Sequence, residues 1–372
     1  MKEIHSNEGL RKLLAENVEI SDIGFQGLNL LPFKEEILKS NVHDCLFLGC
    51  VLDGEMLEKI CLRNFVFPSF KMPFTTHPNR LYHRGDLYQG FDARNPKSYK
   101  ESPDHKIYQH FTKFGKEPAN LRVSLARRLH DHGISDALHE FLHDVPEKKI
   151  VGIMGGHSML RTDPMYRQIT HLSSHLSEKG YMMVSGGGPG AMEATHLGVW
   201  LTGQPRDVWD KSFKILAKAP SYKDTLWLST AFEVIERFPS KSNIKSLGIP
   251  TWLYGHEPPT PFASHIAKYF ANSLREDGLL AIAKGGVVFS PGSAGTIQEI
   301  FQDATQNHYL TEEISSPMVF LGKKYWTKDY PIFSLLKKMV EEDKYNNLIL
   351  SLTDDNDEVI HELENFSFSP GI

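Results

Sequence analysis

Three glycine-rich turns, each directly after a short apolar run, constrain the fold of this chain more than any other feature. The turns cover Gly155–Ser158, Gly186–Gly190 and Pro291–Thr296. The runs before them are typical of buried strands, and the segments after them have helical patterns. Strands that alternate with helices favour crossover connections and a parallel sheet covered on both faces. We therefore predict an α/β fold with a doubly wound parallel sheet.

The same patterns predict individual elements from Lys149 onward. Asp163 and Pro164 supply an N-cap and a first helical proline, and Gly180 is a stop signal, so we expect a helix over Asp163–Lys179. Expected strands are Ile150–Met154, Tyr181–Val184, Phe213–Ala217, Ile249–Tyr254, Val287–Ser290 and Met318–Leu321; further helices are expected from Ala191 and over Phe262–Glu276 and Gly295–His308.

The first 148 residues have a different character, with no glycine-rich turn between strand and helix. A polar, aromatic-containing stretch runs from Arg84 to Glu117, and short helical patterns follow over Pro118–Asp131 and Ser135–His143. The segment Ile20–Asp53 has spaced apolar residues but shows no repeat. We place a boundary near Pro146, which gives an N-terminal segment of residues 1–148, an extension or small domain of undetermined fold, and an α/β domain of residues 149–372.

Composition narrows the classes of partner and the compartment. The chain of 372 residues has a net charge of -5, so its overall field attracts neither nucleic acid nor anionic membranes. Cys45, Cys50 and Cys61 lack the spacing of a zinc site, and we interpret them as reduced core thiols. Without a signal peptide or a membrane-spanning run, the expected location is cytoplasmic.

Glycine-rich turns at the carboxyl ends of parallel strands are suited to binding phosphate. Backbone N–H groups converge there, and the following helix adds its positive N-terminal dipole. The second turn also fits a dinucleotide pattern through Gly186, Gly188 and Ala191, with Asp207 about 20 residues further on. That pattern follows the second strand of the domain instead of the first, and Asp207 lies in a turn instead of a strand end, so a dinucleotide cofactor is disfavoured.

The third turn leads into a helix that carries Thr296 and Glu299. One interpretation is a capping box, in which both side chains bond free backbone donors of the helix. The other is functional: Glu299, near a bound phosphosugar, stabilises developing positive charge or orients a water molecule.

The glycine-rich turns and the helices after them resemble the signatures of a known family. Pro291–Glu299 is similar to the PGGxGTxxE signature of the LOG family, Rossmann-like proteins long misnamed lysine decarboxylases, and Ser185–Ala194 is similar to the family's GGGPGxMEA signature. Gly155–Ser158 occupies the place of its first loop. The resemblance covers about Lys149–Lys344 and leaves out the N-terminal segment. It implies hydrolysis of the N-glycosidic bond of nucleoside 5′-monophosphates to free base and ribose 5-phosphate.

The resemblance assigns roles residue by residue. The family's acidic catalytic residue falls on Glu299, and its arginine falls on Arg275. The other interpretation of Arg275 is a solvated basic residue near a helix C-terminus. Ser293 replaces the second glycine of the signature. One interpretation of the segment with His256 and Glu257 is that one of these residues lines the base pocket. The other is that the segment is a surface turn. The residues expected to bind substrate are Gly155, His157, Ser158, Gly187, Gly188, Gly190, Gly292, Ser293, Ala294, Gly295 and Thr296.

The function expected is therefore a nucleosidase that needs no metal and no cofactor and forms a homodimer or a higher homo-oligomer, with the N-terminal segment used for regulation or oligomer contacts. An oxocarbenium-like transition state would be stabilised by a carboxylate beside the ribose. A second hypothesis is a non-catalytic binder or carrier of a phosphorylated ligand, similar to molybdenum cofactor carriers. A third, a DNA-processing protein, is disfavoured by the acidic charge.

Overall fold

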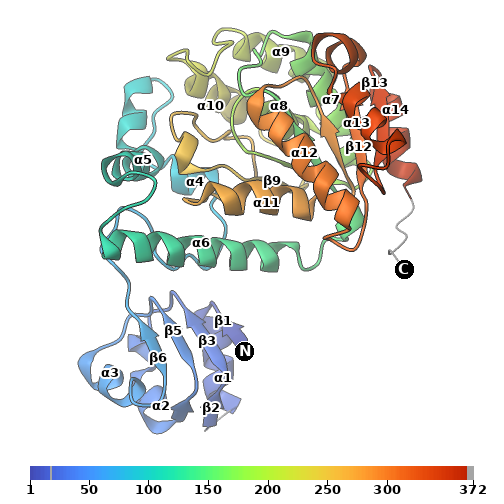
Figure 1. The fold of residues 1–372 in the computed structure, drawn as a ribbon. Coiled ribbons are helices and arrows are strands. Elements are labelled where there is room, and N and C mark those ends of the chain that lie inside the picture. The colour runs from blue at the N-terminus through green and yellow to red at the C-terminus, as the bar shows by residue number, and fades with distance from the viewer. Residues whose placement is uncertain (17–18, 367–372) are drawn as a thin grey trace. The chain divides into compact units, whose positions relative to one another are not determined.

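The computed structural model describes residues 1–16 and 19–366, which form two compact units (Figure 1). Unit 1 contains Met1–Leu81 and Gln109–Leu142, and unit 2 contains Tyr82–Tyr108 and the chain from His143 onward. The sequence alone placed one division near Pro146. In the structure, Tyr82–Tyr108 lies within the α/β unit, although both flanking segments belong to unit 1.

Unit 2 is built on a seven-stranded sheet in the order β10-β9-β8-β7-β11-β12-β13, and all of its strand pairs are parallel. The first strand, β7, is central; β8 and β9 follow on one side, and β11 to β13 follow on the other. This is the strand order of a doubly wound, Rossmann-like sheet with one short extra strand at an edge. The predicted fold class is confirmed. The strands are β7 Ile150–Met154, β8 Met182–Ser185, β9 Ser246–Gly248, β10 His265–Ile266, β11 Gly286–Phe289, β12 Pro317–Leu321 and β13 Ile349–Thr353.

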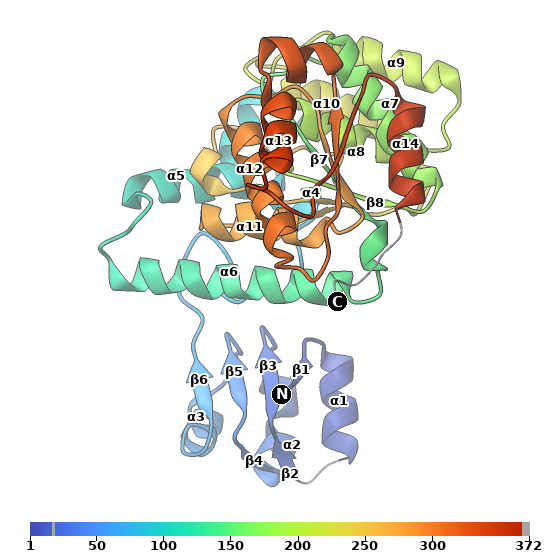
Figure 2. The same cartoon turned by 45° about the vertical axis from the view of Figure 1, so that its right-hand side comes forward.

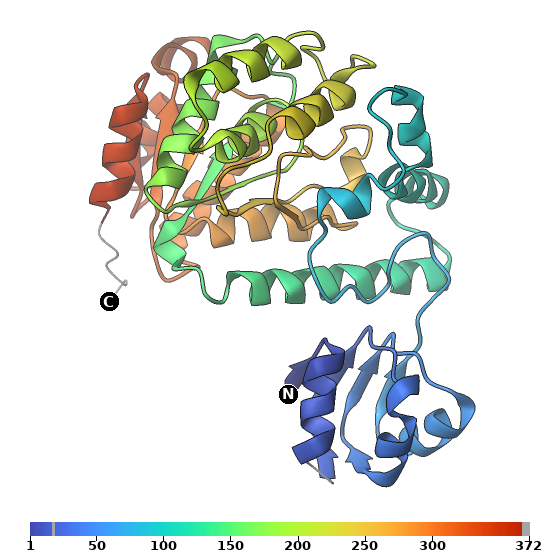
Figure 3. The same cartoon turned by 180° about the vertical axis from the view of Figure 1, so that it is seen from behind.

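Helices cover both faces of this sheet, as a sheet buried on both sides requires. Figure 1 shows α11 and α12 in front of it, and Figure 3, seen from behind, shows α7, α9 and α10 across the other face. Strands β7, β8, β9, β11 and β12 are buried along their whole length. Side chains of all of these except β9 join those of α7 and α8 in one apolar cluster. The helices of unit 2 are α4 Arg84–Leu87, α7 Pro164–Glu178, α8 Ala191–Leu201, α9 Arg206–Leu216, α10 Trp227–Arg237, α11 Asn272–Ile282, α12 Ala294–Tyr309, α13 Ile332–Glu341 and α14 Asn356–Asn365, and α5 Pro103–Phe114 begins in it.

Helix α7 shows how local sequence signals set an element of this unit. The Asp163 side chain accepts a hydrogen bond from the Met165 N–H at 2.8 Å, and Pro164 occupies the first helical position. At the other end Gly180 has a φ of 80°, and the N–H groups of Gly180 and Tyr181 donate to carbonyls of the last turn. This is a Schellman ending that requires a residue with positive φ. The helix predicted over Asp163–Lys179 is confirmed.

Two predictions between β8 and α11 are wrong. The apolar run Phe213–Ala217, predicted as a strand, closes helix α9, because its buried side chains face the core at helical spacing. The segment Phe262–Glu276, predicted as one helix, contains strand β10 and only the start of α11. There the N–H groups of Ala267 and Tyr269 donate to the carbonyls of Gly248 and Pro250, so sheet-edge pairing prevails over helical propensity.

Other predicted elements are shifted or confirmed. The strand expected over Ile249–Tyr254 ends at Gly248, because Pro250 cannot donate to a ladder, and Trp252–Tyr254 form a 3₁₀ turn. The strands at Val287–Ser290 and Met318–Leu321 and the helix over Gly295–His308 are confirmed within one residue or two by β11, β12 and α12. The short turns are 3₁₀ segments at Leu31–Phe33, Pro96–Glu101, Glu147–Lys149 and Trp252–Tyr254, with a π-helical turn at Tyr325–Asp329.

A buried ion pair ties Tyr82–Tyr108 into unit 2. Lys268 Nζ donates to Asp104 Oδ1 at 2.5 Å, and both side chains are fully buried. Tyr99 and Trp252 also donate to the Asp104 carboxylate, at 3.0 and 3.2 Å. Burial lowers the pKa of Lys268, and the Asp104 charge opposes that shift. Such a pair costs desolvation to form and is strongly destabilising to break on one side.

Unit 1 contains a repeat that the sequence analysis missed. Figure 2 shows β1, β3, β5 and β6 side by side, and these strands pair in parallel in that order, while β2 pairs with β4. Residues 24–26 pair with residues 46–48, and residues 19–21 with residues 41–43, always 22 positions apart. Asp22 and Asp44 share a positive φ, as do Gly27 and Gly49, so two successive coils have the same bends.

The core of unit 1 follows this repeat. Phe25 stacks on Phe47 with ring centroids 4.8 Å apart, one from each coil. The two helical patterns predicted in residues 118–143 form one helix, α6. Gly133, in the middle of it, packs too closely against the Pro78 carbonyl for a Cβ to fit. The elements are β1 Lys2–Ile4, α1 Asn7–Glu16, β2 Glu19–Ser21, β3 Ile23–Gln26, α2 Lys34–Lys39, β4 Asn41–His43, β5 Leu46–Leu48, α3 Gly54–Ile60, β6 Phe65–Phe67 and α6 Leu121–Leu142.

The three cysteines of unit 1 are all free thiols. Cys45 is buried and Cys50 is half-buried, but Cys61 is exposed, so its assignment to the core is wrong. Burial raises the pKa of Cys50 to about 11. Among the described residues, no helix is both long and apolar enough to cross a membrane; the cytoplasmic location stays a prediction.

Candidate active site

A cavity of about 260 Å³ lies where the loops after β7, β8, β9 and β11 meet. β7 and β11 are neighbours in the sheet, but the chain leaves them in opposite directions, toward β8 and toward β12. Ligands of open α/β sheets bind at such switch points, beyond the carboxyl ends of the strands. The cavity is therefore in the position where this sheet would be expected to hold a small molecule.

Eight of the thirteen residues predicted for the site line this cavity. They come from the first and third glycine turns and from α11 and α12, which are far apart in the sequence. They are Gly155, His157, Arg275, Ser293, Ala294, Gly295, Thr296 and Glu299. The other five, Ser158, Gly187, Gly188, Gly190 and Gly292, do not line it.

Two of the four glycines among these five residues pack the loops against one another instead of facing the cavity. A Cβ on Gly292 would collide with the Thr296 side chain and lie 3.0 Å from the Gly156 nitrogen. Gly190 has a φ of 69°, and a Cβ there would run into the backbone of the first turn. These positions therefore demand glycine because the turns approach closely. The prediction took them as ligand contacts; the structure gives them a packing role.

The start of α12 presents unpaired backbone donors to the cavity. Its N-cap residue is Ser293, whose side chain makes no capping bond. The N–H groups of Ala294, Gly295 and Thr296 donate to no described residue, and these residues line the cavity. Free N–H groups at the positive end of a 16-residue helix form a site for an anion.

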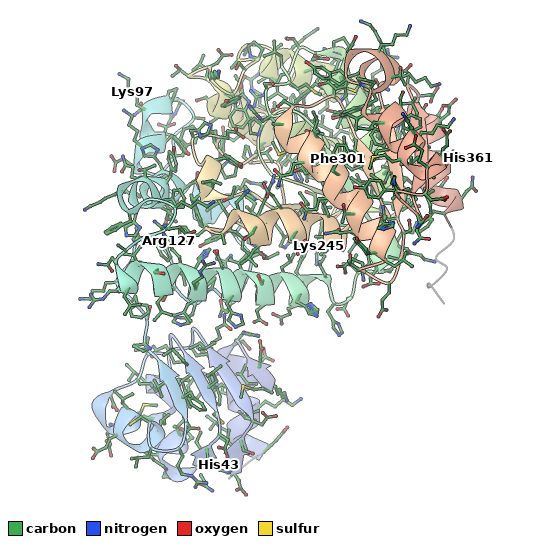
Figure 4. All side chains as sticks on the ribbon, in the orientation of Figure 1. His43, Lys97, Arg127, Lys245, Phe301 and His361 are labelled. Carbon is green, nitrogen blue, oxygen red and sulfur yellow. The ribbon has the colours of Figure 1, made fainter. Side chains whose placement is uncertain are left out.

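Glu299 lies one turn further along the same helix and is 7% exposed. Because Thr296 is the third helical residue and not the cap, the capping-box interpretation is wrong. The Glu299 carboxylate instead pairs with Arg275, whose Nη1 lies 3.4 Å from Oε1. Phe301, labelled in Figure 4, lies two residues beyond Glu299 on α12.

Arg275 is held from two sides. It lies in the first turn of α11 with its side chain 11% exposed, so it is not a solvated residue at a helix end. Its Nε donates to the Ile249 carbonyl at 3.0 Å, just after β9. A Cβ on Gly186 would collide with the guanidinium, so glycine at that position makes room for the arginine.

Burial and charge act against each other on Glu299. Burial raises the pKa of its carboxyl, since the charged form loses hydration, and the Arg275 guanidinium lowers it. The net direction is upward. Arg275 therefore favours the ionised form in a place where burial alone would favour the protonated one.

Other residues that the sequence motifs did not predict also line the cavity. Met154, Gly156, Gly186, Met192, Tyr254 and Glu276 line it, in addition to Glu257, which the sequence analysis weighed together with His256. His256 does not line it. Gly186 and Met192 belong to the second signature, whose spacing gave no means of telling lining residues from packing residues. Asp207, from the dinucleotide pattern, is in an exposed ion pair with Lys211 on α9.

A second buried ion pair lies beneath the second glycine turn. The carboxylate of Glu193, on α8, accepts hydrogen bonds from Arg161 Nε at 2.8 Å and Nη2 at 2.5 Å. Tyr166 donates to the same carboxylate at 2.9 Å, and Arg161 also donates to the carbonyls of Ala219 and Trp227. The glutamate of the second signature therefore braces α8 against the chain near α10 and does not face the cavity.

Two other features were considered as sites, a second hollow and a cluster of metal-ligand side chains, and neither contains a residue predicted for the site. A wider hollow of about 700 Å³ between α7 and α9 contains none of the predicted residues and is edged by exposed charged side chains such as Arg167, Arg206 and Lys241. Among the described residues, the one group with metal-ligand spacing is Glu3, His5 and Asp136 in unit 1, where Glu3 is already hydrogen-bonded to Asp136.

Comparison with known proteins yields structural likeness only. No protein-family model and no curated protein matches the sequence. A structural-genomics target named TM1055 is similar at 19% identity and a TM-score of 0.38, over 58% of this chain and 99% of that chain. A molybdenum cofactor binding protein from Rippkaea orientalis is similar at 14% sequence identity and a TM-score of 0.34. The molybdenum cofactor carrier protein of Chlamydomonas reinhardtii is similar at 13% identity and the same TM-score. Each match covers 58% of this chain and at least 94% of the other chain. At these identities and TM-scores the likenesses bear on neither activity nor ligand.

Proposed function

We propose that this chain is a hydrolase that cleaves the N-glycosidic bond of nucleoside 5′-monophosphates to free base and ribose 5-phosphate. The observation that carries the proposal is the meeting of Arg275 and Glu299 in the cavity into which the free N–H groups of α12 open. The resemblance of Pro291–Glu299 and Ser185–Ala194 to the LOG signatures supports the same activity. The fold alone would not, because related folds host unrelated functions.

In this proposal the helix start and the glutamate divide the work. The N–H groups of Ala294, Gly295 and Thr296 hold the 5′-phosphate, and binding energy gained there fixes the ribose near Glu299. As the bond to the base breaks, positive charge develops on the sugar, and the ionised Glu299 carboxylate stabilises it. Arg275 favours the ionised, oriented carboxylate. Water adds its oxygen to C1′ as the bond to the base breaks, one of its protons goes to the departing base, and the products are free base and ribose 5-phosphate.

The alternative is a binder or carrier of a phosphorylated ligand without turnover. One observation favours it: burial raises the pKa of Glu299, and a protonated glutamate would donate a hydrogen bond to a ligand instead of stabilising charge. The two hypotheses share the phosphate site and differ only in whether product forms.

The test is incubation of the full chain with AMP, GMP, CMP and UMP, with identification of both products. The proposal expects free base and ribose 5-phosphate in equal amounts over many turnovers. Glu299→Gln should abolish release while the variant still folds and binds, and Glu341→Gln, which alters an exposed glutamate at the end of α13, should behave as wild type. Tight binding with no release from any nucleotide would leave the carrier hypothesis in its place.

Assembly and the role of the N-terminal segment rest on the resemblance alone. We propose a homodimer or a higher homo-oligomer in which unit 1 contributes contacts or regulation. Light scattering of the intact chain gives the oligomer size directly, and a monomer at all concentrations would contradict this part of the proposal.

A further inference from the structure

The carboxylate of Glu257 faces the cavity and receives no hydrogen bond from the described residues. Its side chain is 14% exposed, and its carboxylate accepts no hydrogen bond from any described residue. Two imidazoles approach it, those of His256 and His157, whose Nε2 atoms lie 3.7 and 3.8 Å from Oε1, beyond hydrogen-bond length. A carboxylate that faces a cavity and receives no hydrogen bond from the protein is available to a ligand that brings donors.

The position of Glu257 in the sheet separates it from the proposed phosphate site. Glu257 follows β9, and the free N–H groups of α12 follow β11. The two groups line the same cavity from loops that leave different strands, and Glu257 Oε1 lies 3.8 Å from Nε2 of His157 in the loop after β7. A nucleotide whose phosphate lies at α12 would therefore extend its base toward Glu257. This step rests on the proposed function.

The chemistry of a carboxylate restricts which base fits. Its two oxygens only accept, and two parallel N–H donors satisfy both at once. Guanine offers such a pair, the ring N1–H and the 2-amino group. Adenine and cytosine each place an acceptor beside the amino group, and uracil places acceptors on both sides of its N–H. The same donor pair, in a 2-amino-4-oxopyrimidine edge, also occurs in pterins.

We propose that Glu257 is a specificity-determining residue that selects ligands with a 2-amino-4-oxopyrimidine edge. The wall around it agrees with a flat ring system: Met192 approaches from α8, and a Cβ on Gly188 would lie 3.7 Å from Glu257 Oε2. The same Cβ would lie 2.9 Å from Met192 Cε, so glycine at position 188 makes room for the Met192 side chain in this wall.

The experiment measures equilibrium binding in the full-length Glu299→Gln variant, which removes the proposed turnover. The probes are GMP, IMP, which lacks the 2-amino group, AMP, dihydroneopterin monophosphate and ribose 5-phosphate. We expect GMP or the pterin phosphate, or both, to bind at least about tenfold tighter than IMP and AMP, because a polar site left unpaired rejects the analogue. Whichever of the two binds tighter identifies the source of the edge.

Adding Glu257→Gln should reduce that preference to less than about threefold, because the amide offers one acceptor where the edge needs two. Affinity for ribose 5-phosphate should stay unchanged, which a merely structural role for Glu257 would not produce. Equal affinity for GMP, IMP and AMP in the parent variant, or equal weakening of every probe by Glu257→Gln, would overturn the proposal. Because only binding is measured, it can fail while the nucleosidase activity stands, and it can stand if no hydrolysis is found.

Discussion

At the scale of single residues, the site depends on the opposed influences of burial and charge on Glu299. The residue is buried on α12, where its carboxyl would hold a proton, and Arg275 lies 3.4 Å away and favours release of that proton. A carboxylate near a developing cation must be ionised to help. The arginine is therefore as much a part of the proposed chemistry as the glutamate.

This opposition predicts a pH dependence. The pKa of Glu299 is raised, so the acid limb of kcat/KM should lie above that of a free glutamate, and activity should grow as pH rises through it. Arg275→Ala removes the lowering influence and should move the limb to higher pH, whereas Arg275→Lys should move it less. The measurement is a pH profile of kcat/KM for the three proteins. An acid limb at the same pH in all of them would show that Arg275 does not act on Glu299.

Asp303 is buried on α12, one turn beyond Glu299. We expect its carboxyl to make the free energy of unfolding depend on pH. Burial raises its pKa from 3.8 to about 8, and its Oδ2 has no hydrogen-bond partner. Between these values the folded state keeps a proton that the unfolded chain has released, so the free energy of unfolding falls as pH rises. Asp303→Asn should flatten that slope and raise the free energy of unfolding at pH 8 by more than about 1 kcal/mol.

Denaturant unfolding at several pH values checks this, with Asp144→Asn as the control, since Asp144 is almost fully exposed. A variant whose stability keeps the wild-type slope between about pH 4 and 8 would mean that Asp303 is not the group responsible.

At the scale of elements, the buried ion pair of Glu193 and Arg161 braces helix α8, which follows the second glycine turn. Glu193→Ala would leave Arg161 buried without its carboxylate and should lower the free energy of unfolding by about 3–5 kcal/mol. Lys211→Ala, which breaks the exposed pair with Asp207, should cost no more than about 1 kcal/mol. Denaturant midpoints of both variants test the contrast, and similar losses in the two would contradict the bracing role of Glu193.

The sequence predicted most where local signals and the tertiary structure agree. The strands that lead into the glycine turns, helix α7 with its cap, and the pair of Arg275 and Glu299 all followed from spacing or from the signatures. The segments Phe213–Ala217 and Phe262–Glu276 were misassigned for two reasons. The first is too short for its helical spacing to show, and the second pairs at the sheet edge despite its helical pattern.

The 22-residue repeat of unit 1 escaped for a different reason. Its matching positions, such as Phe25 with Phe47 and Gly27 with Gly49, are separated by segments that differ in sequence. Two coils give too few examples for a pattern to stand out. Glu257 as a cavity residue was likewise weighed only as one of a pair, since nothing local separates it from His256.

At the scale of the whole molecule, the division into units determines which truncation removes unit 1 without disturbing unit 2. A deletion up to Pro146 would remove unit 1 and also Tyr82–Tyr108, and with it the partner of the buried Lys268. Loss of activity in such a deletion would therefore say nothing about unit 1 alone.

A point substitution tests this attachment in the intact chain. Asp104→Ala should lower the free energy of unfolding by about 3–5 kcal/mol and increase hydrogen exchange over Tyr82–Tyr108. Adding Lys268→Met should recover much of the loss, because no unpaired charge then stays buried. Unchanged exchange in Asp104→Ala would show that the ion pair does not hold the segment in place.

The measurement that tests the central claim most directly compares hydrolysis of a nucleoside 5′-monophosphate with that of the same nucleoside without phosphate. With the phosphate held at the start of α12 and the sugar near Glu299, we predict repeated release of base and ribose 5-phosphate from the nucleotide. For the nucleoside kcat/KM should be at least about 100-fold lower, since hydrogen bonds to a charged group contribute about 1.5–3 kcal/mol each. Equal rates for the two substrates, or no base released from any nucleotide that binds, would contradict the account.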